Sequence, residues 1–456
     1  MYSREKASKI SHIDVMNNDL VSSILNQIEI KEGNSLNNDI KGLKKIDFIL
    51  ENPKEDDISS IIVVDGSNTT QKVKDLSCSF IKTGYMILYP DGIKKLSNRR
   101  LDNRLFSIFL DGNAEIHSTF IPLSSRFSIA GKDLANSVRE ILYLSFVEDN
   151  TFDYKALKAL KYMMFKKWNN NKEPSRAFEC PHKCKNQIRI PYNKNKTICE
   201  ACGNEVYITD YIGFHKLFES SNYIPDKLVV DYMLLHETLT LFYFILYYYL
   251  LEKSRYRSEK ANYLKSILFL KDGPLSLSYT YTNVILDINE FLSHLREENY
   301  NLNLCGQEKT GNLVEYFSNY KKDNKLKENS NPKHNEIIFI DDKFIQESIN
   351  PKALYYTELH GRPSTYGSKV CVVSQGERII LSLNTGGKYI SDPDEKNLLN
   401  LERILKRVLT VRTLTHNGAL YPIRAINDKV SLAKGLPVRM LEEFLVEKLL
   451  LKLDEK

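Results

Sequence analysis

Four cysteines lie within 23 residues of one another, and no other feature limits the possible folds of this chain as strongly. They are Cys180, Cys184, Cys199 and Cys202. A CxxxC pair and a CxxC pair are separated by fourteen residues, so each pair fits one knuckle and the four thiolates can close a tetrahedral shell around Zn²⁺. Such a shell leaves no position open for a substrate. The spacing predicts a ribbon insert at 176–208 held by structural Zn²⁺, with His182 as a solvated neighbour.

Composition restricts the class of protein. A hydrophobic share of 42% and a charged share of 27% over 456 residues are typical of folded globular domains and exclude collagen-like or disordered chains. The 64 Lys and Arg residues exceed the 58 Asp and Glu residues by six, a small basic excess that permits a polyanionic partner. The seven cysteines do not form a disulfide scaffold. We therefore expect a cytoplasmic protein.

No membrane segment is expected. The N-terminal residues lack an apolar core followed by a small-residue cleavage site, so they do not resemble a signal peptide. The longest uncharged apolar run, 238–251, has 14 residues, whereas a membrane-spanning helix needs about 20. This run predicts a buried helix.

Strand-like runs alternate with helical patterns, and some strands follow each other as hairpins. This predicts an α/β protein with a mixed sheet flanked by helices. Neither GxGxxG nor GxxxxGK[ST] is present, so nucleotide binding has little support. The expected division is a helical N-terminal lead-in at 1–55, a first part of the main domain at 56–175, the ribbon insert, and a second part at 209–456 that ends in a helix.

Two Asp-Gly pairs follow buried apolar runs: Asp65 in IIVVDGSNTT and Asp272 in ILFLKDGPLSL. A strand that delivers a carboxylate to its end, next to a glycine, suits metal binding. The alternative is that both pairs are hairpin turns. A third carboxylate, Glu237, lies in an otherwise apolar helical pattern, where an unpaired charge is costly to bury. His236 and Asp231 are expected at the edge of that helix.

Three such carboxylates can hold one or two hard divalent cations, Mn²⁺ or Mg²⁺, as enzymes that hydrolyse phosphodiesters do. The ordered set of DGS, the helical glutamate, DGPL and a C-terminal YP before an alanine-containing helix resembles the NurA nuclease family over about residues 55–450. The likeness is greatest to the bacterial members that carry a zinc ribbon. It implies an RNase H-like fold, Mn²⁺-dependent cleavage of DNA, and a HerA-type hexameric ATPase as partner.

The resemblance also assigns residues. Its acidic positions fall on Asp65, Glu237 and Asp272, and its C-terminal tyrosine falls on Tyr421. Where the family usually has a histidine, this chain has Lys429, which cannot bind a hard cation while protonated but can contact a phosphate.

DNA contacts are expected at Lys309, which resembles a family lysine, and at Arg362 in the basic and aromatic stretch LHGRPSTYGSK. A homodimer is expected, with apolar residues of the C-terminal helix such as Met440 and Phe444 as contact surfaces or, alternatively, as core. The leading interpretation is a metal-dependent DNA nuclease that works with a HerA-type translocase in DNA end processing or in defence against phage. The alternatives are an inert NurA-like scaffold that binds DNA or the ATPase, and a zinc-ribbon factor that binds DNA or processes RNA.

Overall fold

The structure is a computed structural model of the 456-residue chain. The residues that it describes are 23, 40, 42–50, 58–73, 76–97, 112–147, 155–218, 225–254, 263–300, 302–318, 334–349, 364–412, 419–432, 440–441 and 443–448. Most of the predicted lead-in and Arg362 lie outside these residues.

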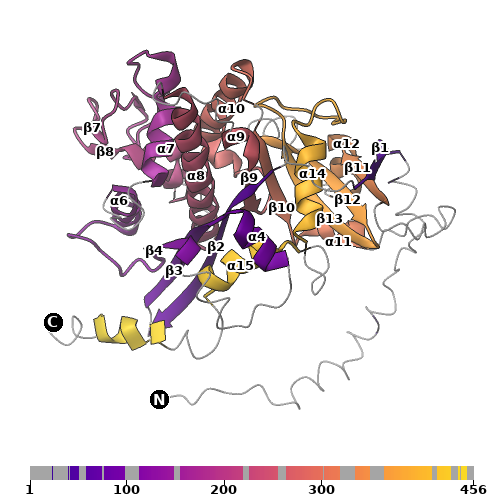
Figure 1. Cartoon of the computed structure of the whole chain (residues 1–456). Coiled ribbons are helices and arrows are strands. Elements are labelled where there is room, and N and C mark those ends of the chain that lie inside the picture. The colour runs from indigo at the N-terminus through magenta and orange to yellow at the C-terminus, as the bar shows by residue number, and fades with distance from the viewer. Residues whose placement is uncertain are drawn as a thin grey trace.

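One mixed sheet of nine strands crosses the molecule (Figure 1). Its spatial order is β1-β11-β12-β13-β10-β9-β2-β3-β4. The strands are β1 (Lys45–Ile49), β2 (Ser60–Val73), β3 (Leu76–Leu88), β4 (Ala114–Pro122), β9 (Ile267–Asp272), β10 (Asn303–Glu308), β11 (His334–Ile340), β12 (Gly367–Ser374) and β13 (Glu377–Asn384). The predicted mixed α/β class is confirmed.

The centre of the sheet is parallel and its two flanks are antiparallel. β2 pairs with β9 from Ser60↔Ile267 to Val64↔Lys271, and β9 pairs with β10 up to Asp272↔Gln307. β2, β3 and β4 form an antiparallel meander on one flank, and β10 to β13 continue antiparallel on the other. The two parallel pairings therefore end next to each other in the middle of the sheet.

Helices cover both faces of the sheet (Figure 1). One face carries α6 (Leu134–Val147), α7 (Lys155–Met164), α8 (Pro225–Lys253), α9 (Tyr263–Ser266) and α10 (Thr282–Glu297), whose apolar residues form the largest core. The other carries α4 (Pro90–Ser97), α14 (Leu401–Thr410) and α15 (Tyr421–Val430). The short helices α11 (Asn312–Ser318) and α12 (Asp342–Phe344) enclose a third, smaller core over β11 to β13.

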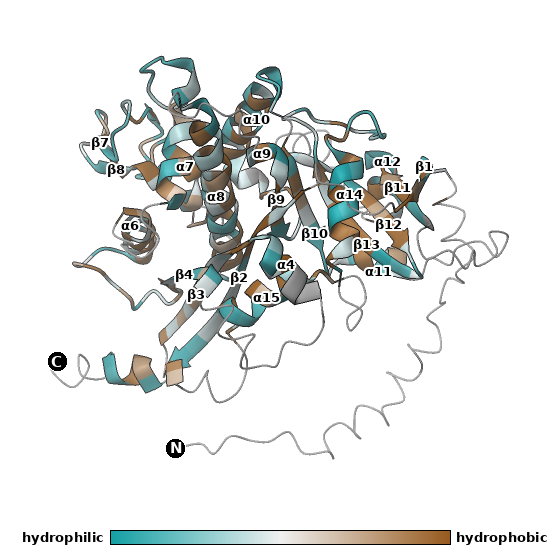
Figure 2. Ribbon diagram, viewed as in Figure 1, coloured by the Kyte–Doolittle hydropathy of each residue, from teal (hydrophilic) through white to brown (hydrophobic). Residues whose placement is uncertain are grey.

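Helix α8 is apolar on nearly every side (Figure 2), which is typical of a helix packed from all directions. Its length and composition would let it cross a membrane, but 78% of its most apolar window is buried inside the fold. A core helix has the same properties, and the sequence prediction of a buried helix is confirmed.

Candidate active site

Asp65 and Asp272 lie on neighbouring parallel strands. Because Val64 is paired with Lys271, the residues that follow them stand side by side. Side chains alternate along a strand, so both carboxylates continue the face whose apolar members are Val63 and Leu270. Asp65 is 2% exposed, and the Asp272 side chain is 16% exposed.

The hairpin-turn alternative is wrong for both Asp-Gly pairs. β2 continues through Gly66 to Val73, so Asp65 lies inside a strand of 14 residues and not at its end. Asp272 does end β9, but the next strand, β10, runs parallel to β9, and a tight turn cannot connect parallel strands. Gly273 has φ +96°, a conformation that glycine adopts without strain.

Glu237 approaches the same place from α8 on the opposite face. Its side chain is 2% exposed, and a Cβ atom added to Gly66 would lie 2.5 Å from Glu237 Oε1. The glutamate therefore packs directly against the backbone next to Asp65. The three acidic residues selected from the sequence thus lie near one another where the parallel pairing of β2 and β9 ends, with Asp65 and Asp272 on one face of the sheet and Glu237 on the other.

Two lysines accompany the acidic residues. Lys271 Nζ lies 3.3 Å from Glu237 Oε2 and donates a hydrogen bond of 3.1 Å to the carbonyl oxygen of Asp272. Lys309 Nζ lies 2.6 Å from Asp272 Oδ2. Lys309, predicted from the sequence as a DNA contact, thus lies beside the acidic cluster, and its contact with DNA stays a prediction. The fully buried Lys271 was not selected from the sequence.

Burial dominates the electrostatics of this cluster. It raises the pKa of Asp65 to about 9, with help from the charges of Asp272 and Glu237. It also raises the pKa of Glu237 to about 7, against the opposing charge of Lys271. Burial disfavours the charge of Lys271, but Glu237 and Asp272 keep the pKa of that lysine above its usual value. With a pKa of about 9, Asp65 is protonated at neutral pH, so Lys271 and Lys309 face at most the two charges of Glu237 and Asp272.

The donor set fits a hard cation, with one condition. Asp65 Oδ2 and Glu237 Oε2 are buried and accept no aligned hydrogen bond, so both have a lone pair available. Among the described residues, the oxygens of the three carboxylates do not converge within 4.8 Å as the four cysteine sulfurs do, and Asp272 pairs with Lys309 and Glu237 with Lys271. A divalent cation would be held by Asp65, Glu237 and Asp272 once Lys309 has left Asp272.

We expect Gly66→Ala to disrupt this arrangement. The added methyl group would meet Glu237 Oε1 at 2.5 Å and Met233 Cγ at 2.7 Å, so these two side chains of α8 must shift. Overpacking of this kind typically costs about 1–3 kcal/mol. Thermal unfolding should show the loss. Gly112→Ala is the matched control, since nothing lies within 4 Å of its added Cβ. Equal stability of the two variants would contradict the close approach.

The C-terminal end of α15 lies against β2, which carries Asp65, and against its neighbour β3. The backbone N–H of Leu432 donates to Ser67 Oγ at 3.1 Å, and Lys82 Nζ donates to the carbonyl oxygen of Lys429 at 3.0 Å. Ser67 is paired with Lys82 two positions beyond Asp65, about 7 Å along the strand on the same face. Burial and the charge of Lys429 lower the pKa of Lys82. Two lysines thus stand next to the acidic cluster.

Tyr421 begins α15, eight positions before Lys429 and hence about 12 Å away along the helix. It packs against the apolar core beneath the sheet. Tyr421 and Lys429 therefore lie at opposite ends of α15. The role of Tyr421 stays a prediction.

For Lys429 we expect an electrostatic role toward a phosphate. Lys429→Ala should lower the cleavage rate by about tenfold or more, and Lys429→Arg should retain part of it, because an ammonium or guanidinium can stabilise developing negative charge. Lys429→His introduces the residue that the NurA family usually has at this position, and its rate shows whether a histidine can replace the lysine. Rates within about twofold of the unmodified protein for Lys429→Ala would assign the lysine to a solvent-facing turn instead.

Two expectations about α8 are wrong. Asp231 and His236 are buried and do not lie on an exposed edge, because α8 is covered on almost all sides. Asp231 accepts a hydrogen bond of 2.8 Å from Tyr281, and His236 Nδ1 lies 2.7 Å from Thr83 Oγ1. His236 also stacks on His117 with 4.2 Å between ring centroids. Both side chains thus belong to the packed interior around α8.

The four cysteines of the ribbon converge as predicted. Their Sγ atoms all lie within 4.8 Å of one another, with Cys180–Cys202 at 3.9 Å and Cys184–Cys199 at 3.6 Å. Two small hairpins carry them, formed by β5 (Phe178–Glu179), β6 (Gln187–Ile188), β7 (Lys196–Ile198) and β8 (Glu205–Tyr207). The arrangement could hold a tetrahedral zinc ion closed to substrate.

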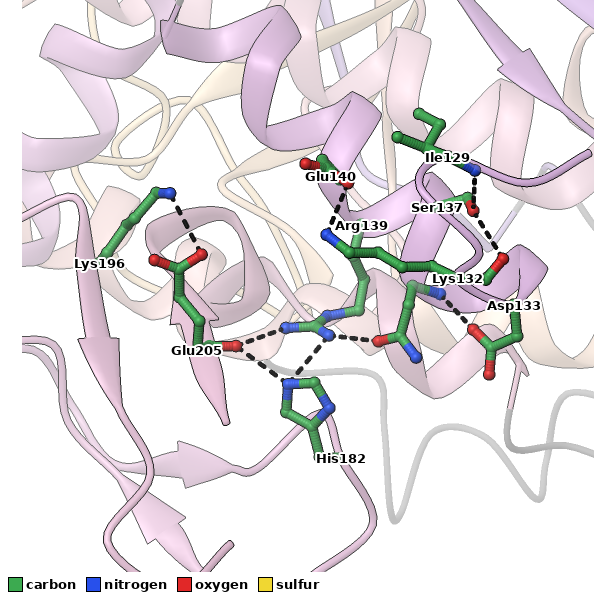
Figure 3. A network of polar contacts seen from close by, with 10 residues as sticks. Ile129, Lys132, Asp133, Ser137, Arg139, Glu140, His182, Lys196 and Glu205 are labelled. Atoms are coloured by element: carbon green, nitrogen blue, oxygen red, sulfur yellow. Dashed lines mark hydrogen bonds and ion pairs between the residues drawn. The ribbon is translucent and has the colours of Figure 1, made fainter. Parts of the chain in front are cut away.

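His182 is not a solvated bystander. Its Nε2 lies 2.9 Å from the carbonyl oxygen of Glu205 and 3.1 Å from an Arg139 nitrogen (Figure 3). Arg139 extends from α6 and forms a buried, two-pronged ion pair with Asp210, at 2.7 Å for both contacts. Removing either partner would leave a buried charge, so this network fastens the ribbon to the main domain.

A mixed sheet that presents carboxylates where its parallel strands end, next to an acidic residue on a buried helix, defines a candidate hydrolase site for a hard cation. No family model matches the chain, and no curated protein matches it. Solved structures similar to it include the NurA nuclease from Sulfolobus solfataricus, with 10% identity, a TM-score of 0.33 and coverage of 98% of this chain and 97% of the other.

A structure of NurA with manganese is also similar, with 14% identity, a TM-score of 0.25 and coverage of 97% and 98%. So is one of NurA bound to dAMP and manganese, with 13% identity, a TM-score of 0.27 and coverage of 98% of both chains. These similarities extend over nearly the whole length of the chain. The values are too low for a residue's role to be taken from these structures.

Proposed function

We propose that this protein is a divalent-metal-dependent DNA nuclease. The observation that supports the proposal is the proximity of Asp65, Glu237 and Asp272, from two strands and a helix, of which Asp65 Oδ2 and Glu237 Oε2 are buried and accept no aligned hydrogen bond. Burying such a set is unfavourable unless a cation or a proton accompanies it. In a metal-dependent nuclease these carboxylates would bind the divalent cation that the reaction needs.

Each residue then has a role in hydrolysis. Bound Mn²⁺ or Mg²⁺ would supply an activated water and stabilise charge on the phosphate. Asp65, Glu237 and Asp272 would hold it, and Lys271 keeps Glu237 oriented from below. Lys309, Lys82 and Lys429 would meet the DNA backbone near the scissile phosphate. Tyr421 and Arg362 stay candidate contacts on the strength of the sequence alone.

A second candidate is a NurA-like scaffold without activity that binds DNA or the ATPase. The observation in its favour is that Lys309 and Lys271 already pair with Asp272 and Glu237, as ammonium groups would in a site that has lost its metal. Lys429 in place of a histidine points the same way.

One experiment separates the two candidates. Purified protein is incubated with end-labelled linear single-stranded and double-stranded DNA, with added Mn²⁺, with Mg²⁺, and with neither. The nuclease proposal expects cleavage only with a divalent cation. Binding of DNA without cleavage under any of these conditions would leave the scaffold, and cleavage without any divalent cation would contradict both.

Other features of the proposal rest on the sequence resemblance. They are the RNase H-like character of the sheet, a HerA-type hexameric ATPase as partner, a homodimer, and a role in DNA end processing or phage defence in the cytoplasm. In the C-terminal helix Met440 is 70% and Phe444 48% exposed, which suits a contact surface, whereas Leu445 is buried. The division into 1–55, 56–175, 176–208 and 209–456 also remains a proposal.

The pKa values of the cluster predict how stability depends on pH. The folded pKa values of Asp65, about 9, and Glu237, about 7, exceed their ordinary values. Between the ordinary and the folded pKa of each group, the folded state therefore binds more protons than the unfolded chain. This contribution to stability is complete at low pH and is lost as the pH rises through 7 to 9. A cation can replace the missing protons.

Mn²⁺ should therefore raise the midpoint of thermal unfolding more at about pH 8.5 than at about pH 6, by about 3 °C or more. Asp65→Asn removes one titrating group and should flatten the metal-free pH dependence. Calorimetric or fluorescence unfolding curves measure both. An equal effect of Mn²⁺ at the two pH values would contradict a cation site formed by these carboxylates.

A further inference from the structure

A cavity of about 470 Å³ lies between α7 and α8, close to the zinc ribbon. Three lysines line it, Lys158, Lys161 and Lys167, and none of the described residues that line it carries a carboxylate. Tyr243 and Tyr247 of α8 form the facing wall. We call this cavity the α7–α8 pocket. Its lining combines positive charge with aromatic surface.

The lysines are held close together. Lys158 and Lys161 are three positions apart on α7, so they share one face of that helix. Lys167 follows the helix and donates to Asn193 Oδ1, a neutral partner, at 2.9 Å. Burial, together with the charge of Lys167, lowers the pKa of Lys161. A negatively charged ligand would relieve this repulsion.

The aromatic wall is unusually open. α8 buries most of its side chains, yet Tyr247 is 48% and Leu250 45% exposed. The ring of Tyr243 lies 6.4 Å from that of Tyr247, and Lys158 Nζ lies 6.0 Å from the Tyr243 centroid. An open ring beside ammonium groups can stack a base while the lysines meet its phosphates.

We propose that the α7–α8 pocket binds a segment of single-stranded nucleic acid, with phosphates at Lys158, Lys161 and Lys167 and a base stacked on Tyr247. The volume suits a nucleotide-sized ligand and not the width of a duplex. A duplex would leave the exposed Tyr247 ring without a partner, because the bases of a duplex are stacked on one another inside it. An acidic peptide would use the lysines but would leave the exposed tyrosine without a role.

The pocket is separate from the acidic cluster. Tyr247 follows Glu237 by ten positions on α8, which corresponds to about 15 Å along the helix axis. A strand held in the pocket could therefore be bound without touching the carboxylates. The proposal does not require that the protein cleaves DNA.

The test is fluorescence anisotropy with a labelled oligothymidylate of about 16 nucleotides and no added divalent cation, so that cleavage cannot interfere. Lys158→Gln/Lys161→Gln should raise the Kd by about tenfold or more, and reduce the slope of log K against log salt by about 1.4. Lys388→Gln/Lys396→Gln, in the loop after β13, removes the same charge elsewhere and should change neither.

Tyr247 tests the stacking. Tyr247→Leu should raise the Kd by about tenfold, whereas Tyr247→Phe keeps the ring and should stay within about twofold. Oligouridylate in place of oligothymidylate shows whether RNA binds equally well. Unchanged affinity in the double lysine variant would overturn the site, and unchanged affinity in Tyr247→Leu would overturn the stacking of a base.

Competition identifies the ligand class. Unlabelled single strands should displace the probe, and neither a duplex of equal length nor polyglutamate should do so as well. Equal displacement by polyglutamate would replace the nucleic acid by an acidic protein partner. These measurements use no divalent cation and do not depend on cleavage, so failure of the nuclease proposal and failure of the pocket can be told apart.

Discussion

Replacing Asp272 by asparagine should lower metal-dependent cleavage by about 10³-fold or more. The amide keeps the size of the side chain but loses the charge that binds a cation, and a cation in a phosphodiester hydrolase supplies several kcal/mol to the transition state. Asp65→Asn and Glu237→Gln should have effects of the same order. Initial rates on end-labelled DNA over a range of Mn²⁺ concentrations provide the measurement.

The fold should survive these changes. Asp65→Asn removes a buried carboxylate whose pKa is already raised by its surroundings, so stability should be unchanged or higher. The matched control is Asp287→Asn, which removes a buried carboxylate 2.9 Å from Arg176, away from the cluster. This variant should lose stability and keep its rate per folded molecule. If any of the three cluster variants cleaved DNA at the normal rate, that residue would not be a metal ligand.

The second large effect concerns the ribbon. Cys202→Ser, or Cys199→Ser, should abolish binding of about one equivalent of zinc and unfold the ribbon, because structural zinc contributes an apparent 10–16 kcal/mol (an order-of-magnitude range) in small ribbons. Elemental analysis of protein purified without chelators measures the zinc. Unfolding curves should show a marked drop in stability, and solubility should fall.

Zinc should not take part in the reaction. In the ribbon variants, whatever cleavage remains should need the same Mn²⁺ concentration as before, since the cysteines leave no position open for substrate. Cys371→Ala is the control: this buried thiol lies in the core over β11 to β13 and should not affect the zinc content. Absence of zinc from the unmodified protein would remove the claim, and a shifted Mn²⁺ requirement would assign zinc a part in catalysis.

The sequence predicted those parts of the structure that depend on local pattern. Cysteine spacing alone located the ribbon, because thiolate geometry allows few arrangements. The apolar context of Glu237 marked it as a residue that needs a partner, because burial of a lone carboxylate is unfavourable. The alternation in ILFLKD could have revealed Lys271 as well, since every second residue of that strand faces α8.

Other features depend on contacts between distant segments, which local pattern does not encode. The length of β2 beyond Asp65 is set by its pairing with β3, and an Asp-Gly pair read alone suggests a turn. The burial of Asp231 and His236 depends on partners such as Tyr281 and Thr83 from elsewhere in the chain. His182 likewise gains its partner, Arg139, only when the ribbon docks on α6.

The continuation of β2 through Asp65 divides the proposed site into a fixed half and an adjustable half. Asp65 and Gly66 lie within the β2–β3 ladder, which continues before and after them along β2, so their backbone cannot shift without breaking that ladder. Asp272, by contrast, ends its strand and is followed by glycine, and Lys309 follows the end of β10. Any rearrangement on binding a cation should therefore occur at Asp272 and Lys309, with Asp65 as the reference point from which the site is assembled.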